Sequence, residues 1–330
     1  MKDILNHLFE HKTFTKKQAK EILTNIATGK YNPAQMAAFL TIYCMRSITV
    51  DELEGFRDAM LDLCLKPGLE DYELIDLCGT GGDGKNTFNI STLASFIVAG
   101  AGYKVAKHGN YGVSSGCGSS NVMEFLGYQF SNDTAKLKRS LDEAGICFLH
   151  APLFHPAMKT LAPIRKELGV KTFINMLGPM VNPSQPKYQM VGVFSLELAR
   201  LYAYLYQKTD KTYTILHDLG GYDEISLTNS FKTFSPSGEN IFAIEGLGLN
   251  KIDAELIGGG ETVQESAKIF SDVLDGNGTT EQNAVVLCNA AMAIKTIHND
   301  KSFSDCYSIA EESLNSKKAL KSFKTLVSIK

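Results

Sequence analysis

Apolar residues in the first part of the chain recur at helical spacing. They do so from Ala19 to Ile26 and again from Leu53 to Leu63, where positions three or four apart share one face of an α-helix. Residues that commonly cap a helix N-terminus stand before these segments and before a third: Thr15 with Gln18, Thr49 with Glu52, and Asn32 followed by Pro33. We therefore expect a small helical bundle over residues 1–67, ended by Pro67 and Gly68.

From Leu74 the pattern changes to short apolar runs that alternate with helical segments. The predicted strands are Leu74–Cys78, Lys104–Lys107, Ile146–His150, Gln189–Phe194 and Thr212–His217. Strands that alternate with helices are typical of a mainly parallel sheet with helices on its faces. The sequence therefore predicts a small helical N-terminal domain and a larger α/β domain over residues 72–330, with ligands bound beyond the carboxyl ends of the strands.

Composition places the chain among ordinary globular proteins. Of its 330 residues, 44% are hydrophobic and 21% are charged, and its formal net charge of −3 gives no reason to expect nucleic-acid binding. The sequence contains no uninterrupted apolar run of about 18 residues, and its start lacks the features of a signal peptide. Its seven cysteines are scattered singly, as in proteins of a reducing compartment. We expect a cytoplasmic protein that binds no membrane.

A glycine-rich stretch, GTGGDGKNTFNIST at residues 79–92, follows the first of the predicted strands. Gly79, Gly81 and Gly84 fit the dinucleotide-binding pattern G-x-G-x-x-G. Gly79, Gly84 and Lys85 also fit most of the nucleotide-binding P-loop, G-x-x-x-x-G-K-[ST]. The two patterns predict different ligands, so the residues around the loop must decide between them.

Both templates fail at a position that their chemistry requires. A dinucleotide site needs a carboxylate after the second strand for the ribose hydroxyls, but this strand ends in Lys107 and His108. A P-loop needs a hydroxyl after its lysine to hold magnesium, and Asn86 lacks one. Glycines that admit a ligand close to the backbone, a helix N-terminus and nearby cations still favour an anion. We therefore predict that this loop binds a phosphate or a diphosphate.

Five motifs occur in register between Asp76 and Thr228. They are GTGGDG with TFNIST, KHGN, SSGCGSSNVMEFLG, HPAMKTLAPIRKELGVKTFINMLGPMVNP and DEISLT. With these motifs the sequence resembles the anthranilate phosphoribosyltransferase family. The resemblance implies transfer of the phosphoribosyl group of 5-phosphoribosyl 1-diphosphate (PRPP) to the amine of anthranilate, a step toward tryptophan. It also implies a PRPP-binding α/β domain, a helical domain that includes part of residues 163–187, and a homodimer formed through the helical domain.

The resemblance further implies which residues bind the substrates. The glycine loop and the start of the next helix correspond to the PRPP site: Gly79, Gly82, Asp83, Thr87, Asn89, Ile90, Ser91 and Thr92. A second segment completes that site: Lys107, His108, Gly109, Asn110, Tyr111, Gly112, Val113, Ser114, Ser115 and Ser119. Residues implied to contact anthranilate are Gly79, Asn110 and Arg165, and those implied to bind Mg²⁺ are Ser91, Asp223 and Glu224.

The residue types suit this chemistry. Diphosphate leaves readily once its charge is neutralised, which Mg²⁺ does as a Lewis acid, and the adjacent Asp223 and Glu224 offer the oxygen ligands that Mg²⁺ takes. The planar guanidinium of Arg165 can bind a carboxylate through two hydrogen bonds. The implied reaction is a direct attack of the amine that inverts the anomeric carbon. We therefore assign no catalytic nucleophile and no general base.

The chain departs from the family pattern in the second segment. Tyr111 and Gly112 follow KHGN, where many members have an arginine and a serine. Gly116 and Cys117 replace a frequent lysine and serine, and Asn121 replaces a frequent aspartate. Two charges that could neutralise phosphate are therefore missing, and the contacts of residues 111–117 stay open.

Two other functions also stay open. The first is a nucleoside phosphorylase of the same architecture, whose glycine loop differs from this one. The second is a non-catalytic relative that binds nucleic acid or regulates, which we expect to be basic and to lack the paired acids. The presence of Lys107, Asp223 and Glu224 and the negative net charge favour the transferase over this relative.

Overall fold

The computed structural model describes residues 1–112 and 117–330. The predicted site residues Val113, Ser114 and Ser115 lie outside the described residues. The chain divides into two compact units, of which the first comprises Met1–Lys66 and Ala151–Pro183 and the second comprises Pro67–His150 and Ser184–Lys330. None of the helices in the described ranges has the length and apolar character needed to span a membrane.

The first unit is helical. Its elements are α1 (Lys2–Phe9), α2 (Lys16–Ala27), α3 (Pro33–Met45), α4 (Val50–Leu63), α8 (Ala151–Phe154), α9 (Met158–Leu168), α10 (Ile174–Leu177) and the 3₁₀ helix η1 (Gly178–Val181). The predicted N-terminal caps are confirmed, because the side chains of Thr15, Asn32 and Thr49 each accept a hydrogen bond from the backbone three residues on. The mid-chain part joins these helices through Phe173, whose ring stacks on Phe56 at 4.5 Å.

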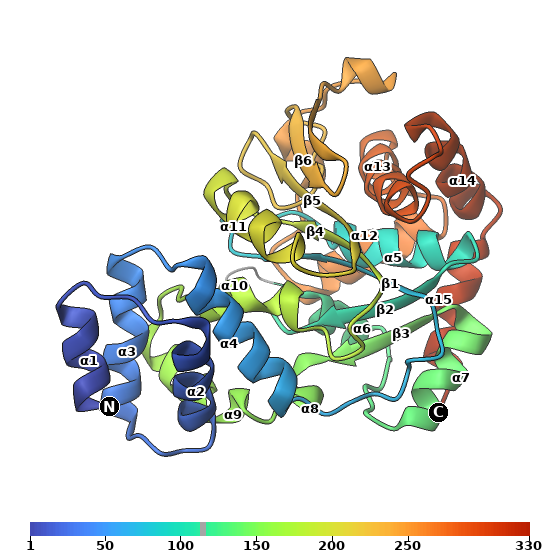
Figure 1. Cartoon of the computed structure of the whole chain (residues 1–330). Coiled ribbons are helices and arrows are strands. Elements are labelled where there is room, and N and C mark those ends of the chain that lie inside the picture. Colours follow the sequence, from blue (N-terminus) through green and yellow to red (C-terminus); the bar gives the residue numbers. More distant parts are fainter. Residues whose placement is uncertain (113–116) are drawn as a thin grey trace. The chain divides into compact units, whose positions relative to one another are not determined.

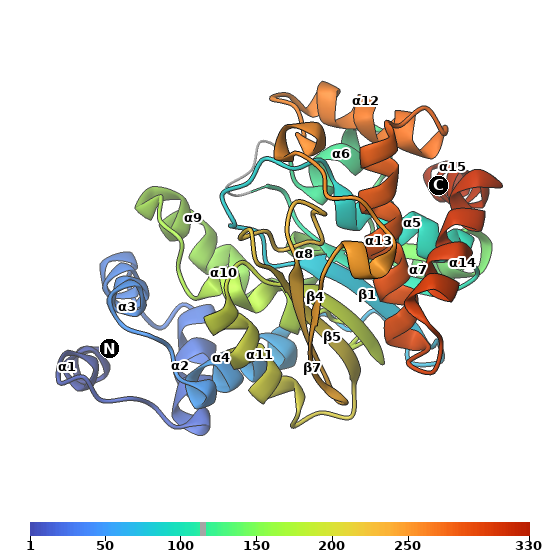
Figure 2. The ribbon, with the colours of Figure 1, turned by 90° about the horizontal axis from the view of Figure 1, so that it is seen from above.

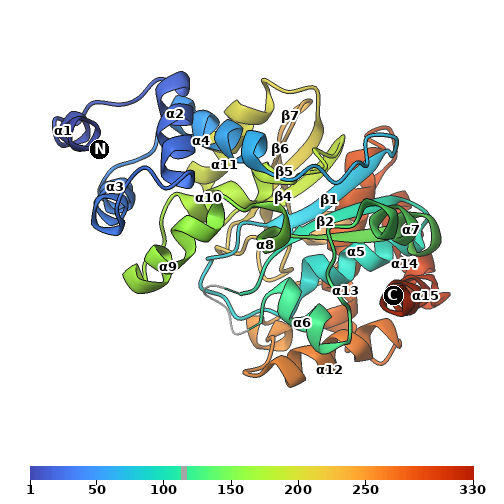
Figure 3. The same cartoon turned by 90° about the horizontal axis from the view of Figure 1, so that it is seen from below.

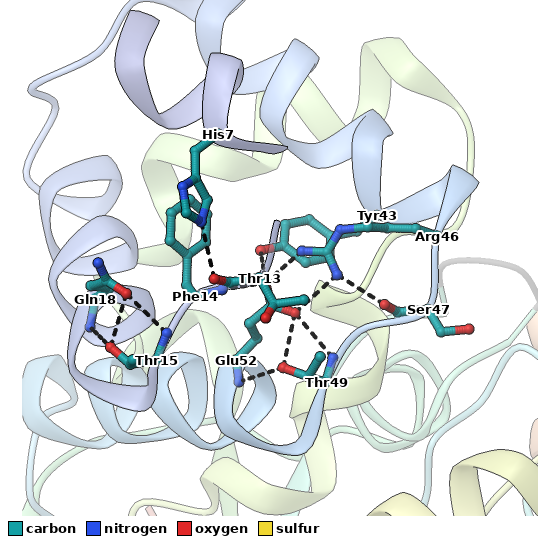
Figure 4. Close-up of polar contacts among 10 residues, drawn as sticks. All are labelled: His7, Thr13, Phe14, Thr15, Gln18, Tyr43, Arg46, Ser47, Thr49 and Glu52. Carbon is teal, nitrogen blue, oxygen red and sulfur yellow. Dashed lines mark hydrogen bonds and ion pairs between the residues drawn. The ribbon is translucent and has the colours of Figure 1, made fainter. Parts of the chain in front are cut away.

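Glu52 ties the start of α4 to other segments of this unit (Figure 4). Its side chain is fully buried. The carboxylate accepts hydrogen bonds from the backbone N–H of Phe14, the hydroxyl of Tyr43 and the guanidinium of Arg46, and it closes the capping box with Thr49. A buried carboxylate is tolerated only with such donors. This network therefore holds α3, α4 and the segment before α2 together.

The second unit contains a seven-stranded sheet (Figure 1). Its strands are β1 (Leu74–Gly79), β2 (Lys104–Gly109), β3 (Ile146–His150), β4 (Tyr188–Gly192), β5 (Thr212–Asp218), β6 (Phe231–Ser235) and β7 (Gly238–Phe242). Their order is β3-β2-β1-β4-β5-β6-β7, with the first five parallel and the last two antiparallel. The predicted mainly parallel sheet is confirmed. Strand β4 ends at Gly192 rather than Phe194, because Ser195 already caps the next helix.

Helices cover both faces of this sheet. The helices of this unit are α5 (Ile90–Gly100), α6 (Ser119–Phe125), α7 (Thr134–Ala144), α11 (Leu196–Tyr206), α12 (Val263–Leu274), α13 (Thr280–Ile297), α14 (Phe303–Asn315) and α15 (Lys318–Ser328), with the 3₁₀ helices η2 (Glu245–Leu247) and η3 (Ala254–Ile257). Helix α13 packs against both α5 and α14 (Figure 2), and α6 packs beside α12 (Figure 3).

Two neighbouring residues of β5 show which helices lie on opposite faces. Thr214 meets Thr296 of α13 through a hydrogen bond of 2.8 Å, whereas the ring of Tyr213 packs against Tyr206 of α11 at 5.2 Å. Successive side chains of a strand point to opposite faces of a sheet. Helices α13 and α11 therefore cover opposite faces of the sheet. Because β1, β2, β4 and β5 are parallel, their carboxyl ends lie along the same side of the sheet.

Candidate active site at the carboxyl edge of the sheet

The glycine loop leaves the sheet directly after β1. Thr80 N–H donates to the carbonyl of Gly192, at the end of the neighbouring strand β4. Gly82 has a φ of +80°, which a residue with a side chain rarely adopts. The far end of the loop is fixed by a backbone bridge between Thr87 and Gly258. The loop is therefore held at both ends while its middle has a backbone that favours glycine.

The acidic pair Asp223 and Glu224 contacts this loop and the start of α5. The backbone N–H of Gly81 donates to Asp223 Oδ2 at 2.6 Å, and that of Ser91 donates to Glu224 Oε1 at 2.8 Å. The second contact places a carboxylate at a helix N-terminus, where the unpaired N–H groups favour negative charge. Ser91, which the resemblance implies as a third Mg²⁺ ligand, thus lies beside Glu224 although the two are far apart in sequence.

Two glycines make room for Asp223. A Cβ atom on Gly79 would lie 2.3 Å from Asp223 Oδ2, and one on Gly192 would lie 1.5 Å from the carbonyl oxygen of Asp223. Both distances are far below van der Waals contact. Gly79 was predicted as a site residue, whereas Gly192 was not. The signal for Gly192 is a glycine at the carboxyl end of a predicted strand.

Replacing Gly192 by alanine should displace the acidic pair, because the new methyl group and the carbonyl of Asp223 cannot both keep their places. We expect turnover to fall by about a hundredfold, the order of loss that follows a shift of about 1 Å in a catalytic group. Gly246→Ala is the matched control, since a Cβ atom there meets no atom within 4 Å. Steady-state kinetics of both variants test this, and equal activity of Gly192→Ala and wild type would contradict it.

Burial and mutual repulsion disfavour the ionised form of the acidic pair. Burial raises the pKa of Asp223 well above its usual range, and the charges of Glu224 and Asp83 raise it further. Burial also raises the pKa of Glu224 to about 7. A cation beside such carboxylates would stabilise their charged form. The arrangement therefore suits a metal ion.

The acidic pair is not part of a larger cluster of His, Cys, Asp and Glu side chains in the described ranges. Within residues 1–112 and 117–330, no three His, Cys, Asp or Glu side chains gather in a way that could hold a metal ion. Mg²⁺ commonly takes one or two carboxylates from the protein and fills its shell with water and substrate phosphate. The donor set of Asp223, Glu224 and Ser91 fits this pattern.

Lys107 lies beneath the start of α5. Its side chain is 2% exposed, and its ammonium donates to the carbonyl of Leu77 at 2.7 Å and to Ser91 Oγ at 3.4 Å. The charge of Glu224 also acts on this ammonium. The buried cation therefore orients the Ser91 hydroxyl and partly balances the acidic pair. The next residue, His108, is fixed through its backbone N–H to Asp76 Oδ1.

The second predicted segment is tied to the start of α6. The carbonyl of Asn110 accepts hydrogen bonds from Ser120 N–H and from Ser119 Oγ, and a Cβ atom on Gly109 would lie 2.5 Å from that Ser119 oxygen. Gly109, Asn110 and Ser119 are thus brought together. Tyr111 continues the segment, with its hydroxyl bonded to Glu124 Oε1 at 3.3 Å.

Asn121 closes the base of this segment. Its Oδ1 atom accepts hydrogen bonds from the backbone N–H groups of Gly112 at 2.9 Å and Gly118 at 3.0 Å. An amide oxygen performs this role without the charge of the aspartate that the family often has here. The substitution noted in the sequence therefore keeps the two ends of the segment together.

The remaining predicted residues lie in or near the first turn of α5, in the glycine loop, or in the other unit. Ile90 and Thr92 are buried in α5, and Asn89 precedes them with its amide bonded to the Cys117 carbonyl. Asp83 accepts a hydrogen bond from Lys85 N–H. Arg165 belongs to α9 of the first unit.

Arg165 is half-buried. Burial lowers its pKa. None of the described residues forms a hydrogen bond or an ion pair with this side chain. A partly desolvated cation without a carboxylate partner is suited to bind an anion that is not part of the chain.

Lys85, the lysine of the glycine loop, contacts the loop that carries Asp223 and Glu224. Lys85 Nζ lies 4.7 Å from the centre of the Tyr222 ring, next to Asp223. This cation–π contact gives the lysine a partner within the protein. It was not expected from the sequence, where Lys85 stood at the P-loop position.

Comparison with known proteins identifies the family. Residues 2–64 match the helical bundle domain of a glycosyl transferase family, and residues 71–320 match its a/b domain. The chain is 61% identical over 326 residues to an anthranilate phosphoribosyltransferase of Flavobacterium psychrophilum, with 99% of this chain and 98% of that protein covered.

Solved structures agree with this match. The crystal structure of anthranilate phosphoribosyltransferase from Thermus thermophilus has a TM-score of 0.91 and 29% identity and covers 98% of each chain. The Saccharomyces cerevisiae enzyme in complex with PRPP and Mg has a TM-score of 0.84 and 25% identity, with 95% of this chain and 92% of that chain covered. Sequence identity, both domains and the fold thus agree, and the chain belongs to the anthranilate phosphoribosyltransferase family.

Proposed function

We propose that the chain transfers the 5-phosphoribosyl group of PRPP to the amine of anthranilate, giving N-(5-phosphoribosyl)anthranilate and diphosphate, in tryptophan biosynthesis. Its family membership supports this reaction. The structural observation that carries it is the contact of Asp223 and Glu224 with the glycine loop and the start of α5.

Growth of a bacterium that lacks this activity tests the proposal. Expression of the chain should restore growth without tryptophan. A nucleoside phosphorylase or a non-catalytic relative of the same fold would not do so. Absence of growth despite folded protein in the cells would contradict the proposed reaction.

PRPP binds at the carboxyl edge of the sheet in this proposal. The residues that would contact it are those predicted from the sequence in the glycine loop, the first turn of α5 and the segment after β2: Gly79, Gly82, Asp83, Thr87, Asn89, Ile90, Ser91, Thr92, Lys107, His108, Gly109, Asn110, Tyr111, Gly112, Val113, Ser114, Ser115 and Ser119. Backbone amides of a glycine loop and a helix N-terminus bind phosphate oxygens well. The contacts of Gly109, Asn110 and Ser119 described above support a preformed second segment.

Mg²⁺ is the cofactor that the site fits best. Asp223, Glu224 and Ser91 would hold it, and the raised pKa values of the two acids support a cation there. When bound, Mg²⁺ neutralises charge that develops on the leaving diphosphate. The protein residues themselves bind and orient the donor, and Lys107 fixes the Ser91 hydroxyl. Catalysis then rests on positioning and electrostatic stabilisation, with no covalent intermediate on the enzyme.

Anthranilate is the acceptor, and we propose that Arg165 binds its carboxylate and that Gly79 and Asn110 are the other residues that contact it, as the resemblance implies. The half-buried guanidinium, which pairs with none of the side chains in residues 1–112 and 117–330, supports this role. Arg165→Ala should raise the KM for anthranilate about ten- to a hundredfold, the loss of roughly 1.5–3 kcal/mol expected for a charge-assisted contact. The KM for PRPP should change little.

Two further variants sharpen this test. Arg165→Lys should recover only part of the affinity, because lysine lacks the planar fork. Lys166→Ala is the matched control, since Lys166 is exposed on the same helix. Equal changes in the KM values of both substrates for Arg165→Ala would assign the arginine a structural or shared role instead.

A homodimer formed through the helical unit is the assembly we propose. Helix α3 has the sequence PAQMAAFLTIYCM, with apolar residues on all sides, and its Met45 is 90% exposed in the single chain. A helix that is apolar all round is usually buried. Sedimentation of the protein should therefore give the mass of two chains, and a monomer at micromolar concentration would contradict this assembly.

The cytoplasm is the proposed location. All seven cysteines are free thiols, which supports a reducing compartment. Cell fractionation tests this placement, and recovery of the protein outside the cytoplasm would contradict it.

A further inference from the structure

The acidic pair lies on a loop rather than on a helix or a strand. Residues 219–230 connect β5 to β6 and contain Asp223 and Glu224. One residue of this loop, Leu227, has a φ of +59°, which is costly for a residue with a side chain. Such a conformation persists only where surrounding contacts fix it. Two buried polar residues, Asp218 and Asn289, make several of the contacts that fix this loop.

Asp218, the last residue of β5, binds both ends of the turn formed by residues 220–226, which contains the acidic pair. Its Oδ1 atom accepts from Gly220 N–H at 2.7 Å. Its Oδ2 atom accepts from the backbone N–H of Ser226 at 3.1 Å and from the Ser226 hydroxyl at 2.6 Å. Its own backbone N–H donates to the carbonyl of Tyr222. The turn is therefore closed from within by a single carboxylate.

Asn289 holds the same turn from another element. It lies on α13, and it binds both backbone polar groups of Ile225, the residue directly after Glu224. Ile225 N–H donates to Asn289 Oδ1 at 3.1 Å, and Asn289 Nδ2 donates to the Ile225 carbonyl at 2.8 Å. The second proton of Nδ2 reaches the carbonyl of Val285 at 2.9 Å, one turn earlier in the helix. Both donors of this amide are used within the protein.

The position of Asn289 in its helix is unusual. The residue is 1% exposed, and its neighbours from Val285 to Ile294 are buried apolar side chains. Burial of an amide gains nothing over burial of leucine unless its hydrogen bonds are needed. Here two of those bonds reach one residue of the acidic loop, 64 positions away in the sequence.

We propose that Asn289 is a positioning residue for the acidic pair. By holding the backbone of Ile225 it fixes where the chain places Asp223 and Glu224 relative to the glycine loop and the start of α5. Loss of the amide side chain leaves the backbone of Ile225 without these hydrogen bonds and lowers the affinity of the acidic pair for its cation. The inference rests on the proposed function, in that the pair binds Mg²⁺.

The test compares full-length Asn289→Ala and Asn289→Ser with Thr296→Val. Thr296 lies on the same helix and is buried, and its hydroxyl donates to Thr214 of β5 rather than to the acidic loop. All three variants lose a buried side-chain hydrogen bond of α13, and all should melt below wild type. Asn289→Ser is included because a smaller change keeps a folded protein available.

The readout is binding of Mn²⁺, followed by electron paramagnetic resonance in the presence of PRPP and without anthranilate. Both Asn289 variants should bind Mn²⁺ about tenfold more weakly, as expected when one or two hydrogen bonds no longer fix the ligand backbone. The Mg²⁺ concentration for half-maximal turnover should rise by a similar factor. Thr296→Val should match wild type in both measurements, and the KM for anthranilate should stay constant throughout.

The variant with Asp223→Ala and Glu224→Ala separates failure of the inference from failure of the proposed function. If this variant loses Mn²⁺ binding while the Asn289 variants keep it, the inference is wrong and the metal site stands. The same holds if Thr296→Val weakens Mn²⁺ binding as much as the Asn289 variants do. If the double variant binds Mn²⁺ like wild type, both the metal site and the role of Asn289 are overturned.

Discussion

Replacing Asp223 and Glu224 together by alanine should reduce turnover by at least about a thousandfold, the several kcal/mol that a metal ion contributes to stabilising a leaving group. The two carboxylates lie on the loop between β5 and β6, where Asp223 accepts a hydrogen bond from the glycine loop and Glu224 accepts one from the start of α5. They are the acidic members of the proposed Mg²⁺ ligand set. Steady-state kinetics at saturating Mg²⁺ measure the loss.

The fold should survive this double change. Burial and the charge of Glu224 raise the pKa of Asp223, so the ionised pair opposes folding at pH 7. The double variant should therefore melt no lower than wild type in the absence of metal. Asp253→Ala with Glu255→Ala removes two exposed acids from the same unit and should leave turnover unchanged. Turnover close to wild type in the Asp223 and Glu224 variant, still dependent on Mg²⁺, would show that the metal binds elsewhere.

Gly82→Val should weaken PRPP binding by at least about a hundredfold. Gly82 has a φ of +80° in the middle of the loop, where a branched side chain strains the backbone and would occupy the space proposed for the diphosphate. Lys85→Ala should change PRPP binding less than about fivefold, because its contact with Tyr222 is worth roughly 0.5–1 kcal/mol. Calorimetric titration with PRPP measures both effects.

A control separates backbone strain from collision with the ligand. Gly248 has a φ of +72°, a Cβ atom placed on it would meet no atom within 4 Å, and it lies outside the loop. Gly248→Val should therefore lose stability but keep its affinity for PRPP. If Lys85→Ala were more damaging than Gly82→Val, the loop would act as a P-loop, and its assignment to a sugar diphosphate would be wrong.

Local sequence signals predicted most of the architecture. The caps at Thr15, Asn32 and Thr49 depend on residues three positions apart in the sequence. The parallel strands are marked by short apolar runs. Both features can therefore be predicted from the sequence alone. Strands β6 and β7 were not predicted. β7, with the sequence GENIF, is an exposed edge strand without the apolar alternation that marks a half-buried one.

The site was predicted through its motifs, but not its internal contacts. The sequence placed the glycine loop directly after a strand, at the carboxyl end where ligands bind in a parallel sheet. It could not show that Gly192 leaves space for Asp223 or that Asn289 holds Ile225, since these pairs are distant in sequence and meet only through packing. Likewise, the burial of Lys107 under Ser91 depends on how α5 lies on the sheet.

Fluorescence of anthranilate, followed with the purified chain, tests the central claim most directly. The account predicts that the signal falls only when PRPP and Mg²⁺ are both present, and that one diphosphate appears for each anthranilate consumed. Omission of either PRPP or Mg²⁺ should leave the signal constant. An unchanged signal with all components present, from protein that is folded and binds PRPP, would contradict the assignment of this site to phosphoribosyl transfer onto anthranilate.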